Sequence, residues 1–252
     1  MKINLKLATF CLALVAVGHS HAAPINLISP SFLTGTQVAT FNDVPGGDAP
    51  GTNYNAVFVS GGVSFAERFT GQTNAPASGF DVLSGLPTGP LSLTLGAINQ
   101  NLNIFLNDGN QVLTGLGPVG FPSNDAIGEG SIAALFSTNQ SEFGFDIVGG
   151  NGGSAFLSFF RRDGSLIDSL VLSGLGSTSY AFSREGGILD IAGVSIYNND
   201  GGGIAFDNVR FNVPSTGGGG GGSVPEPTSL ALVGLALLGA YGARARVKNL
   251  KA

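Results

Sequence analysis

The side chains of this chain that could do chemistry are nearly all carboxylates, amides and hydroxyls. The 252-residue sequence has one cysteine, Cys11, and two histidines, His19 and His21, and all three lie within the first 22 residues. Once that segment is removed, no histidine is left to activate a serine or a cysteine, so nucleophilic hydrolases of that kind are excluded. Zinc sites built on histidine and cysteine are excluded for the same reason.

Two carboxylates that flank a sugar could still hydrolyse a glycosidic bond. Fifteen of the sixteen acidic residues precede Glu226, so many pairs exist, but the sequence alone places no two of them at a catalytic spacing. Most of these residues fall in turns, where aspartate caps the local backbone. We therefore favour a non-enzymatic protein and keep a secreted glycosidase as an alternative.

Asp207 is the carboxylate whose position is most informative. Strict alternation between Ile204 and Phe211 places Asp207 on the same face as Ala205 and Val209. If that face lines the core, the carboxylate must be paired, hydrogen-bonded or bound to a metal. The alternative is that Asp207 accepts hydrogen bonds from loop amides.

Sugar binding is a second alternative. Proteins that bind sugars stack them on exposed aromatic rings, and the chain has no tryptophan. Its tyrosines before the C-terminal segment are Tyr54, Tyr180 and Tyr197. Tyr197 precedes the polar turn 198–200, so a small polar and aromatic rim is one interpretation, and packing of the ring against a neighbouring strand is the other.

The segments that must position these residues have the pattern of strands. Short apolar runs rich in phenylalanine, valine and isoleucine alternate with glycine, asparagine, aspartate and proline. Three hairpins are predicted, each across a turn that supplies positive φ angles: 102–106 with 111–113, 155–160 with 166–172, and 188–197 with 204–213. Further strands are predicted over 36–41, 56–59, 63–65, 91–95, 132–136, 142–148 and 179–182.

About ten strands within residues 24–213 predict an all-β fold, a single two-sheet β-sandwich of the jelly-roll type. Phe143, Phe145 and Ile147 share one face and are expected in the core. The predicted domain loosely resembles jelly-roll carbohydrate-binding modules. That resemblance implies a structural calcium between the loop after the first strand and an aspartate of the last strand, hence Asp207 with Asn42, Asp43 or Asp48.

Residues 1–22 have the composition of a signal peptide. Lys2 and Lys6 precede an apolar run over 7–17, and Ser20 and Ala22 are the small residues that a signal peptidase requires. We place the cleavage after Ala22. The chain is therefore expected to be exported, and an uncleaved N-terminal anchor is the alternative.

The C-terminus carries three different segments in a fixed order. A glycine-rich linker over 214–223 is expected to be flexible, and the motif Val224, Pro225, Glu226, Pro227 follows it. An apolar run comes next, for which we predict a transmembrane helix at about 228–243. The basic flank formed by Arg244, Arg246 and Lys248 is expected to stay on the cytoplasmic side.

This three-part order resembles the PEP-CTERM sorting domain of Gram-negative bacteria. The resemblance covers residues 224–252. It implies recognition by exosortase, a membrane cysteine transpeptidase, with cleavage near the motif and a link to exopolysaccharide or biofilm matrix. The expected route runs from an inner-membrane intermediate to the outer envelope or extracellular matrix.

The net charge of the central domain limits the kinds of partner that it can bind. Residues 24–213 contain five arginines, no lysine and fifteen acidic residues, a formal charge of −10. A polyanion such as DNA or RNA would be repelled, so no nucleic-acid partner is expected. An acidic surface of this kind suits cations or neutral sugars, and no cofactor other than the calcium considered above is implied.

Overall fold

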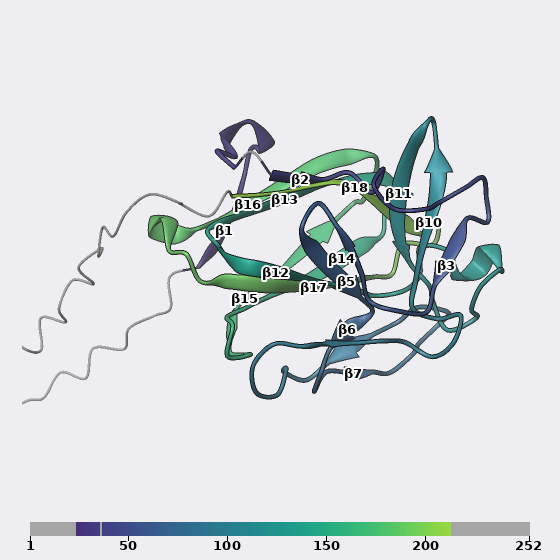
Figure 1. Cartoon of the computed structure of the whole chain (residues 1–252), viewed down its shortest axis with the longest axis horizontal. Helices are drawn as coiled ribbons and strands as arrows, with labels where there is room; N and C mark the ends of the chain where they lie inside the picture. The colour runs from purple at the N-terminus through teal and green to yellow at the C-terminus, as the bar shows by residue number, and fades with distance from the viewer. Residues whose placement is uncertain (1–23, 36, 213–252) are drawn as a thin grey trace, which may run out of the picture. The chain divides into compact units, whose positions relative to one another are not determined.

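The structure is a computed structural model that describes residues 24–35 and 37–212 (Figure 1). The predicted signal peptide, the predicted linker and the C-terminal segment lie outside these residues. The described chain is all-β with three short 3-10 helices: η1 (Pro30–Phe32), η2 (Asn124–Ala126) and η3 (Glu185–Gly187). The predicted all-β class is confirmed.

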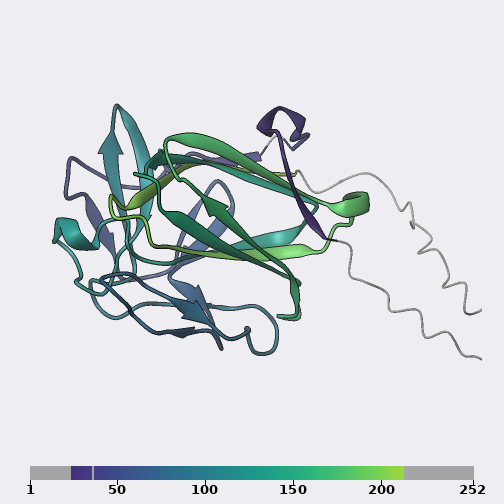
Figure 2. The same cartoon turned by 180° about the vertical axis from the view of Figure 1, so that it is seen from behind.

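Two antiparallel sheets form the domain. Sheet A has the order β1 (Ile25–Ile28), β16 (Thr178–Arg184), β13 (Glu142–Gly149), β18 (Ile204–Phe211), β11 (Asn110–Gly115), β10 (Leu102–Asn107), β3 (Thr52–Tyr54), with β2 (Gln37–Ala39) beside β18. Sheet B has the order β15 (Leu166–Ser173), β14 (Ser154–Phe160), β17 (Ile191–Asn198), β12 (Ile132–Gln140), β5 (Val63–Ala66), β4 (Phe58–Ser60). They form the two layers in Figures 1 and 2.

A segment over residues 67–95, which we call the strap, lies against the outer face of sheet B. It contains two small pairs of strands: β6 (Arg68–Phe69) with β9 (Leu93–Thr94), and β7 (Thr73–Asn74) with β8 (Leu83–Ser84). Phe69 of the strap meets Phe160 of sheet B edge-to-face at 5.6 Å between ring centroids. Together with Leu91, Ala133 and Ala192, these rings make a small second core that fixes the strap to the sheet.

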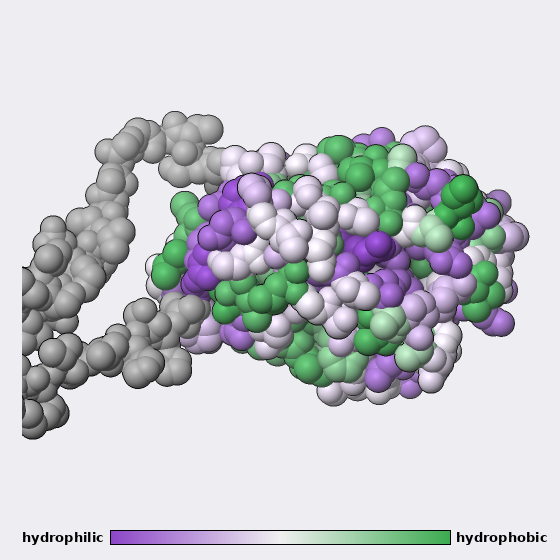
Figure 3. Space-filling model, turned by 90° about the horizontal axis from the view of Figure 1, so that it is seen from below, coloured by the Kyte–Doolittle hydropathy of each residue, from purple (hydrophilic) through white to green (hydrophobic). Residues whose placement is uncertain are grey.

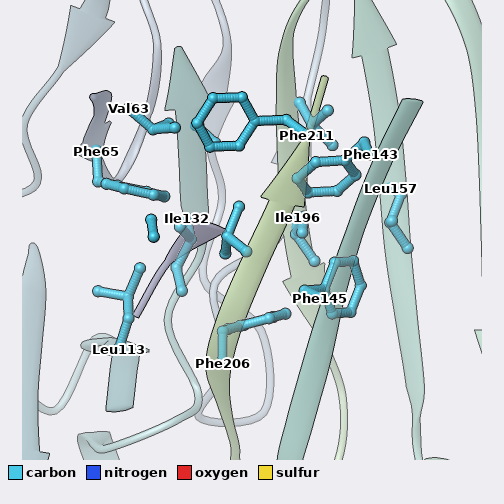
Figure 4. Packing of buried hydrophobic residues seen from close by; sticks show 14 of the residues in the cluster. Val63, Phe65, Leu113, Ile132, Phe143, Phe145, Leu157, Ile196, Phe206 and Phe211 are labelled. Carbon is cyan, nitrogen blue, oxygen red and sulfur yellow. The ribbon is translucent and has the colours of Figure 1, made fainter. Parts of the chain in front are cut away.

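The main core lies between the sheets and is dominated by phenylalanine (Figure 4). Phe143 and Phe145 of β13 are at most 1% exposed and Ile147 is 2% exposed, as the period-two pattern predicts. Phe143 meets Phe159 of the opposite sheet with ring centroids 6.1 Å apart. The expected pair of sheets that share one core is therefore confirmed, and the architecture is sandwich-like.

Two of the three predicted hairpins are confirmed. β10 pairs with β11 across Asp108 and Gly109, which both have positive φ angles, 48° and 86°. β14 pairs with β15 across the turn that contains Gly164. In both cases the turn residues supply the backbone conformations that a tight reversal needs, so the pairing is encoded locally.

The third predicted hairpin is wrong. β17 pairs with β12 and β14 in sheet B, whereas β18 pairs with β13, β11 and β2 in sheet A. The turn between them crosses from one sheet to the other. Each strand lies in the interior of its own sheet, β17 between β14 and β12 and β18 between β13 and β11, so neither has a free edge for the other.

Both ends of the described domain meet at one end of sheet A. Ile25 pairs with Arg184, whose amide donates to the Ser141 carbonyl at 2.8 Å. At the other end of the chain, the Asn212 Oδ1 accepts from the amides of Ser141 and Glu142 at 2.7 and 2.9 Å. The chain therefore enters and leaves the domain on the same side.

Candidate functional site

The residues predicted for sorting and processing lie outside the described part of the chain. These are Ala22, the motif Val224, Pro225, Glu226, Pro227, and the basic flank Arg244, Arg246, Lys248. The predicted helix over 228–243 lies outside it as well. Among the described residues, no helix is long and apolar enough to cross a membrane.

The prediction that Asp207 shares a face with Val209 is wrong, and a β-bulge explains the error. The register between β13 and β18 shifts because Asp146 pairs with Asp207 while Gly144 pairs with Arg210. Asn208 is the extra residue and has a φ of 48°. The bulge shifts the alternation between inward and outward side chains by one residue. Ile204, Phe206, Val209 and Phe211 therefore face the core, while Asp207 points to the outer face of sheet A.

Asp207 lies in an ion-pair cluster on that outer face. Arg210 donates from Nη1 and Nη2 to the two Asp146 carboxylate oxygens at 2.7 and 3.0 Å, and Asn208 Nδ2 donates to Asp146 Oδ2 at 2.8 Å. The burial of Asp146 would raise its pKa, but these hydrogen bonds, together with one from Ser179, outweigh burial and lower it. For Asp207, burial raises the pKa and the Asp146 charge adds to the rise.

The other residues proposed for calcium have separate partners. Asn42 Oδ1 accepts from the Gln111 amide at 3.0 Å, and the Asp43 carboxylate accepts from the Ser60 hydroxyl and from the Gly61 amide. Asp48 closes a local turn through its carbonyl, which accepts from the Gly51 amide at 2.8 Å. Within residues 24–35 and 37–212 no group of three or more acidic, histidine or cysteine side chains could hold a metal ion, so the geometry gives the calcium prediction no support.

Asp81 of the strap and Glu129, which are joined through their backbones, carry two further carboxylates that differ in their partners. Asp81 is 2% exposed and accepts from the amide and the hydroxyl of Ser131 at 2.9 and 3.3 Å. Glu129 precedes β12 and has one buried carboxylate oxygen with no hydrogen-bond partner among the described residues. Burial raises the pKa of Glu129 to about 7, and the charge of Asp125 adds to the rise.

The feature with the shape of a binding site is a groove of about 360 Å³ on the outer face of sheet B. Its floor is formed by β14, β15 and β17, and its rim by β8 and the residues that follow β8 in the strap. Figure 3 shows the side of the molecule on which the strap lies, with hydrophobic and weakly polar patches side by side. The lining residues are Gln72, Leu83, Ser84, Gly85, Leu86, Phe156, Leu157, Ser158, Phe160, Leu166, Ser169, Leu170, Val171, Ser195 and Tyr197, and none of them is charged.

Two rows of side chains cross the floor of this groove. In the first row Phe156 is paired with Val171 on one side and with Tyr197 on the other. The Phe156 and Tyr197 rings stack with centroids 4.8 Å apart and planes 13° apart. Both rings are only partly buried, so they offer an aromatic surface to a ligand.

The second row consists of hydroxyl groups. Ser158 is paired with Ser169 and with Ser195, and the hydroxyls of Ser158 and Ser169 are 3.0 Å apart. Gln72 of the strap donates from Nε2 to Ser195 Oγ at 3.1 Å, while its own Oε1 accepts from the Phe69 amide at 3.1 Å. Because a hydroxyl has one donor and two acceptor sites, these serines keep capacity for a ligand.

Sequence reasoning found one member of this groove, Tyr197, and missed the others. A signal existed in Ser154-Ala155-Phe156-Leu157-Ser158, where alternation places serine, phenylalanine and serine on one face. That pattern does not show which face is the outer one. Nor does it show that Gln72, which lies 123 residues from Ser195, completes the row.

Comparison with known proteins identifies the C-terminal signal. Residues 223–247 match the family model of the PEP-CTERM protein-sorting motif. The match includes the motif Val224, Pro225, Glu226, Pro227 and two residues of the basic flank, Arg244 and Arg246. No curated protein and no solved structure matches the chain.

Proposed function

We propose that this chain is an exported, non-enzymatic surface protein that an exosortase delivers through its PEP signal to the outer envelope or the extracellular matrix, where it associates with exopolysaccharide. The observation that carries the proposal is the sorting motif at residues 223–247. A motif of this kind implies export and processing by an exosortase at the membrane. The destination and the role there are our extension of that implication.

The segments at the two ends of the chain are consistent with one order of processing steps. Signal peptidase removes residues 1–22 after Ala22, and the apolar run that ends near residue 243 holds the protein in the inner membrane. Arg244, Arg246 and Lys248 keep the C-terminus on the cytoplasmic side. The PEP motif then lies on the far side of that membrane from the basic flank, where the exosortase acts on it.

We further propose that the domain is a jelly roll. From β11 onward, sheet A has the order β11-β18-β13-β16 and sheet B has the order β12-β17-β14-β15. Consecutive strands switch repeatedly between the sheets. The last two strands are inserted between earlier ones, because β18 lies between β11 and β13 and β17 lies between β12 and β14. This order supports two interlocked Greek keys of eight strands.

The absence of an enzymatic role is supported by where the carboxylates lie. A glycosidase needs two carboxyl groups on either side of the bound sugar, and the groove on sheet B has no acidic residue in its lining. The paired acids Asp146 and Asp207 lie on the opposite sheet, and Arg210 neutralises one of them. The jelly-roll domain is therefore proposed to bind rather than to react.

The sorting proposal is tested by replacing Pro225 and Glu226 with alanine together. We expect the wild-type protein to lose its C-terminal segment and to reach the surface fraction, and the double variant to keep its full C-terminal mass and to stay in the inner membrane. Ser223→Ala, next to the motif, is the control and should be processed like the wild type. Equal C-terminal mass and equal location for the double variant and the wild type would overturn the proposal.

A further inference from the structure

The residues that line the groove on sheet B indicate which chemical class of ligand it can bind. Its lining combines aromatic and aliphatic side chains with four serines, one glutamine and the Tyr197 hydroxyl. A volume of about 360 Å³ lies at the lower end of the range for small-ligand sites, about 300–1,000 Å³. Apolar walls with a few fixed hydrogen-bonding groups are typical of such sites.

Charge excludes two classes of ligand. No lysine or arginine lines the groove, so no residue there is placed to pair with a phosphate, sulfate or carboxylate. The domain as a whole has fifteen acidic residues against five arginines over residues 24–213, which repels a polyanion before contact. A cation would equally lack a carboxylate partner in the groove.

The hydroxyl row argues against a purely apolar ligand. Ser195 is 3% exposed and accepts from Gln72, so its own proton needs an acceptor in any complex that excludes water. Burial alone raises the pKa of Tyr197, with no contribution from a hydrogen bond within the described residues. Covering these groups with an aliphatic side chain would leave them unsatisfied, which is costly.

From these observations we infer that the groove is a binding site for an uncharged glycan. The C–H face of a pyranose ring lies against the face of the Tyr197 ring that the stacked Phe156 ring leaves free, since the electron-rich face of an aromatic ring attracts polarised C–H groups. The sugar hydroxyls exchange hydrogen bonds with Ser158, Ser169 and Ser195. The groove is partly open to solvent, so one sugar unit of a longer polymer can enter it.

This inference rests on the proposed function, because it names the partner of the sorted domain. It also specifies how the strap contributes. Gln72 is itself fixed at both ends of its amide, by the Phe69 amide and by Ser195. It is a positioning residue, because its hydrogen bond fixes the Ser195 hydroxyl in the row with Ser158 and Ser169.

The test is isothermal titration calorimetry on the processed protein recovered from cells. The probes are neutral hexasaccharides of glucose, mannose and galactose, the exopolysaccharide of the producing cells, and a hexamer of mannuronate as the charged comparison. We expect saturable binding of at least one neutral probe and none of the charged hexamer. Absence of binding to every neutral probe, or tighter binding of the charged one, would overturn the inference.

Three variants locate the binding. Tyr197→Ala removes half of the aromatic pair and should weaken binding about tenfold. Val171→Arg adds a bulky charge at a position that is 58% exposed, so it should block the groove and leave the core intact. Phe32→Ala is the control, because Phe32 is an aromatic residue, 70% exposed, that lies outside the groove. Circular dichroism confirms that each variant is folded.

The outcomes separate this inference from the sorting proposal. Unchanged affinity in both Tyr197→Ala and Val171→Arg overturns the glycan site while the protein is still sorted. If only Phe32→Ala loses binding, the glycan binds on another face of the domain, and the inference is overturned. Displacement of the glycan by an apolar peptide that binds more tightly would identify the groove as a peptide site instead. None of these results depends on the PEP motif.

Discussion

The outer faces of the two sheets use polar residues in opposite ways. On sheet A, Asp146, Asp207, Asn208 and Arg210 form a network in which most groups are satisfied by one another. On sheet B, the corresponding face has serines and aromatic rings and no charge along the groove. The difference indicates that the first face is closed within the protein and that the second is available to a ligand.

The bulge at Asn208 is the reason that the charged face stays outside. Without the extra residue, alternation from Phe206 would turn Arg210 toward the core and Val209 toward solvent. The left-handed conformation of Asn208 shifts the phase by one residue, so Val209 is 3% exposed and Arg210 meets Asp146 on the outside. β14 and β17 pair in regular register around the groove, and their alternation is unbroken there.

The largest expected effect tests the core that supports both faces. Phe143→Ala should lower the free energy of unfolding by about 3–5 kcal/mol, because it leaves a cavity beside four other phenylalanine rings. Urea unfolding followed by circular dichroism measures the change. A loss below about 1 kcal/mol would mean that the two sheets do not share this core.

The second prediction concerns the charged face. Arg210→Ala leaves the Asp146 carboxylate beside Asp207 with no counter-charge and should cost about 1–2 kcal/mol in unfolding free energy. Arg210→Lys keeps the charge without the two parallel hydrogen bonds and should lose less. Equal stability of Arg210→Ala and the wild type in urea would show that this network contributes no stability.

The third prediction concerns Glu129, which belongs to neither face. Its folded pKa is about 7 against an ordinary value of 4.5. Between these values the folded state holds a proton that the unfolded state has lost, so stability should fall as pH rises from about 4.5 to about 7. The loss should be about 1 kcal/mol after allowing for solvent screening. Glu129→Gln should remove this part of the slope in unfolding measured across that range, and an unchanged slope would contradict it.

The smallest effect is expected on the uncharged face. Ser158→Ala should change the free energy of unfolding by less than about 0.5 kcal/mol, because the hydroxyl is partly exposed and bonds only to another exposed serine. The same variant should bind the neutral hexasaccharide less tightly. A large loss of stability with unchanged binding would mean that Ser158 stabilises the fold and does not bind the ligand.

Local signals in the sequence predicted much of the fold. The Asp108-Gly109 and Arg161–Ser165 turns predicted their hairpins, and alternation around Phe143 predicted the buried face of β13. The strands β1, β3, β6, β7 and β8 were not predicted, since two to four residues carry too little periodicity. Of the residues that line the groove, only Tyr197 was predicted as a ligand contact.

The sequence by itself determined which side chains are available for chemistry, the two-residue period of the strands and the sorting motif near the C-terminus, because each is a property of residue type or of near neighbours. Only the tertiary structure decided that β17 and β18 belong to different sheets, that Asn208 shifts the phase of β18, and that Gln72 meets Ser195. These depend on which strands pair across long separations, and hydrogen-bonded partners in a sheet are selected by the packing of the whole core.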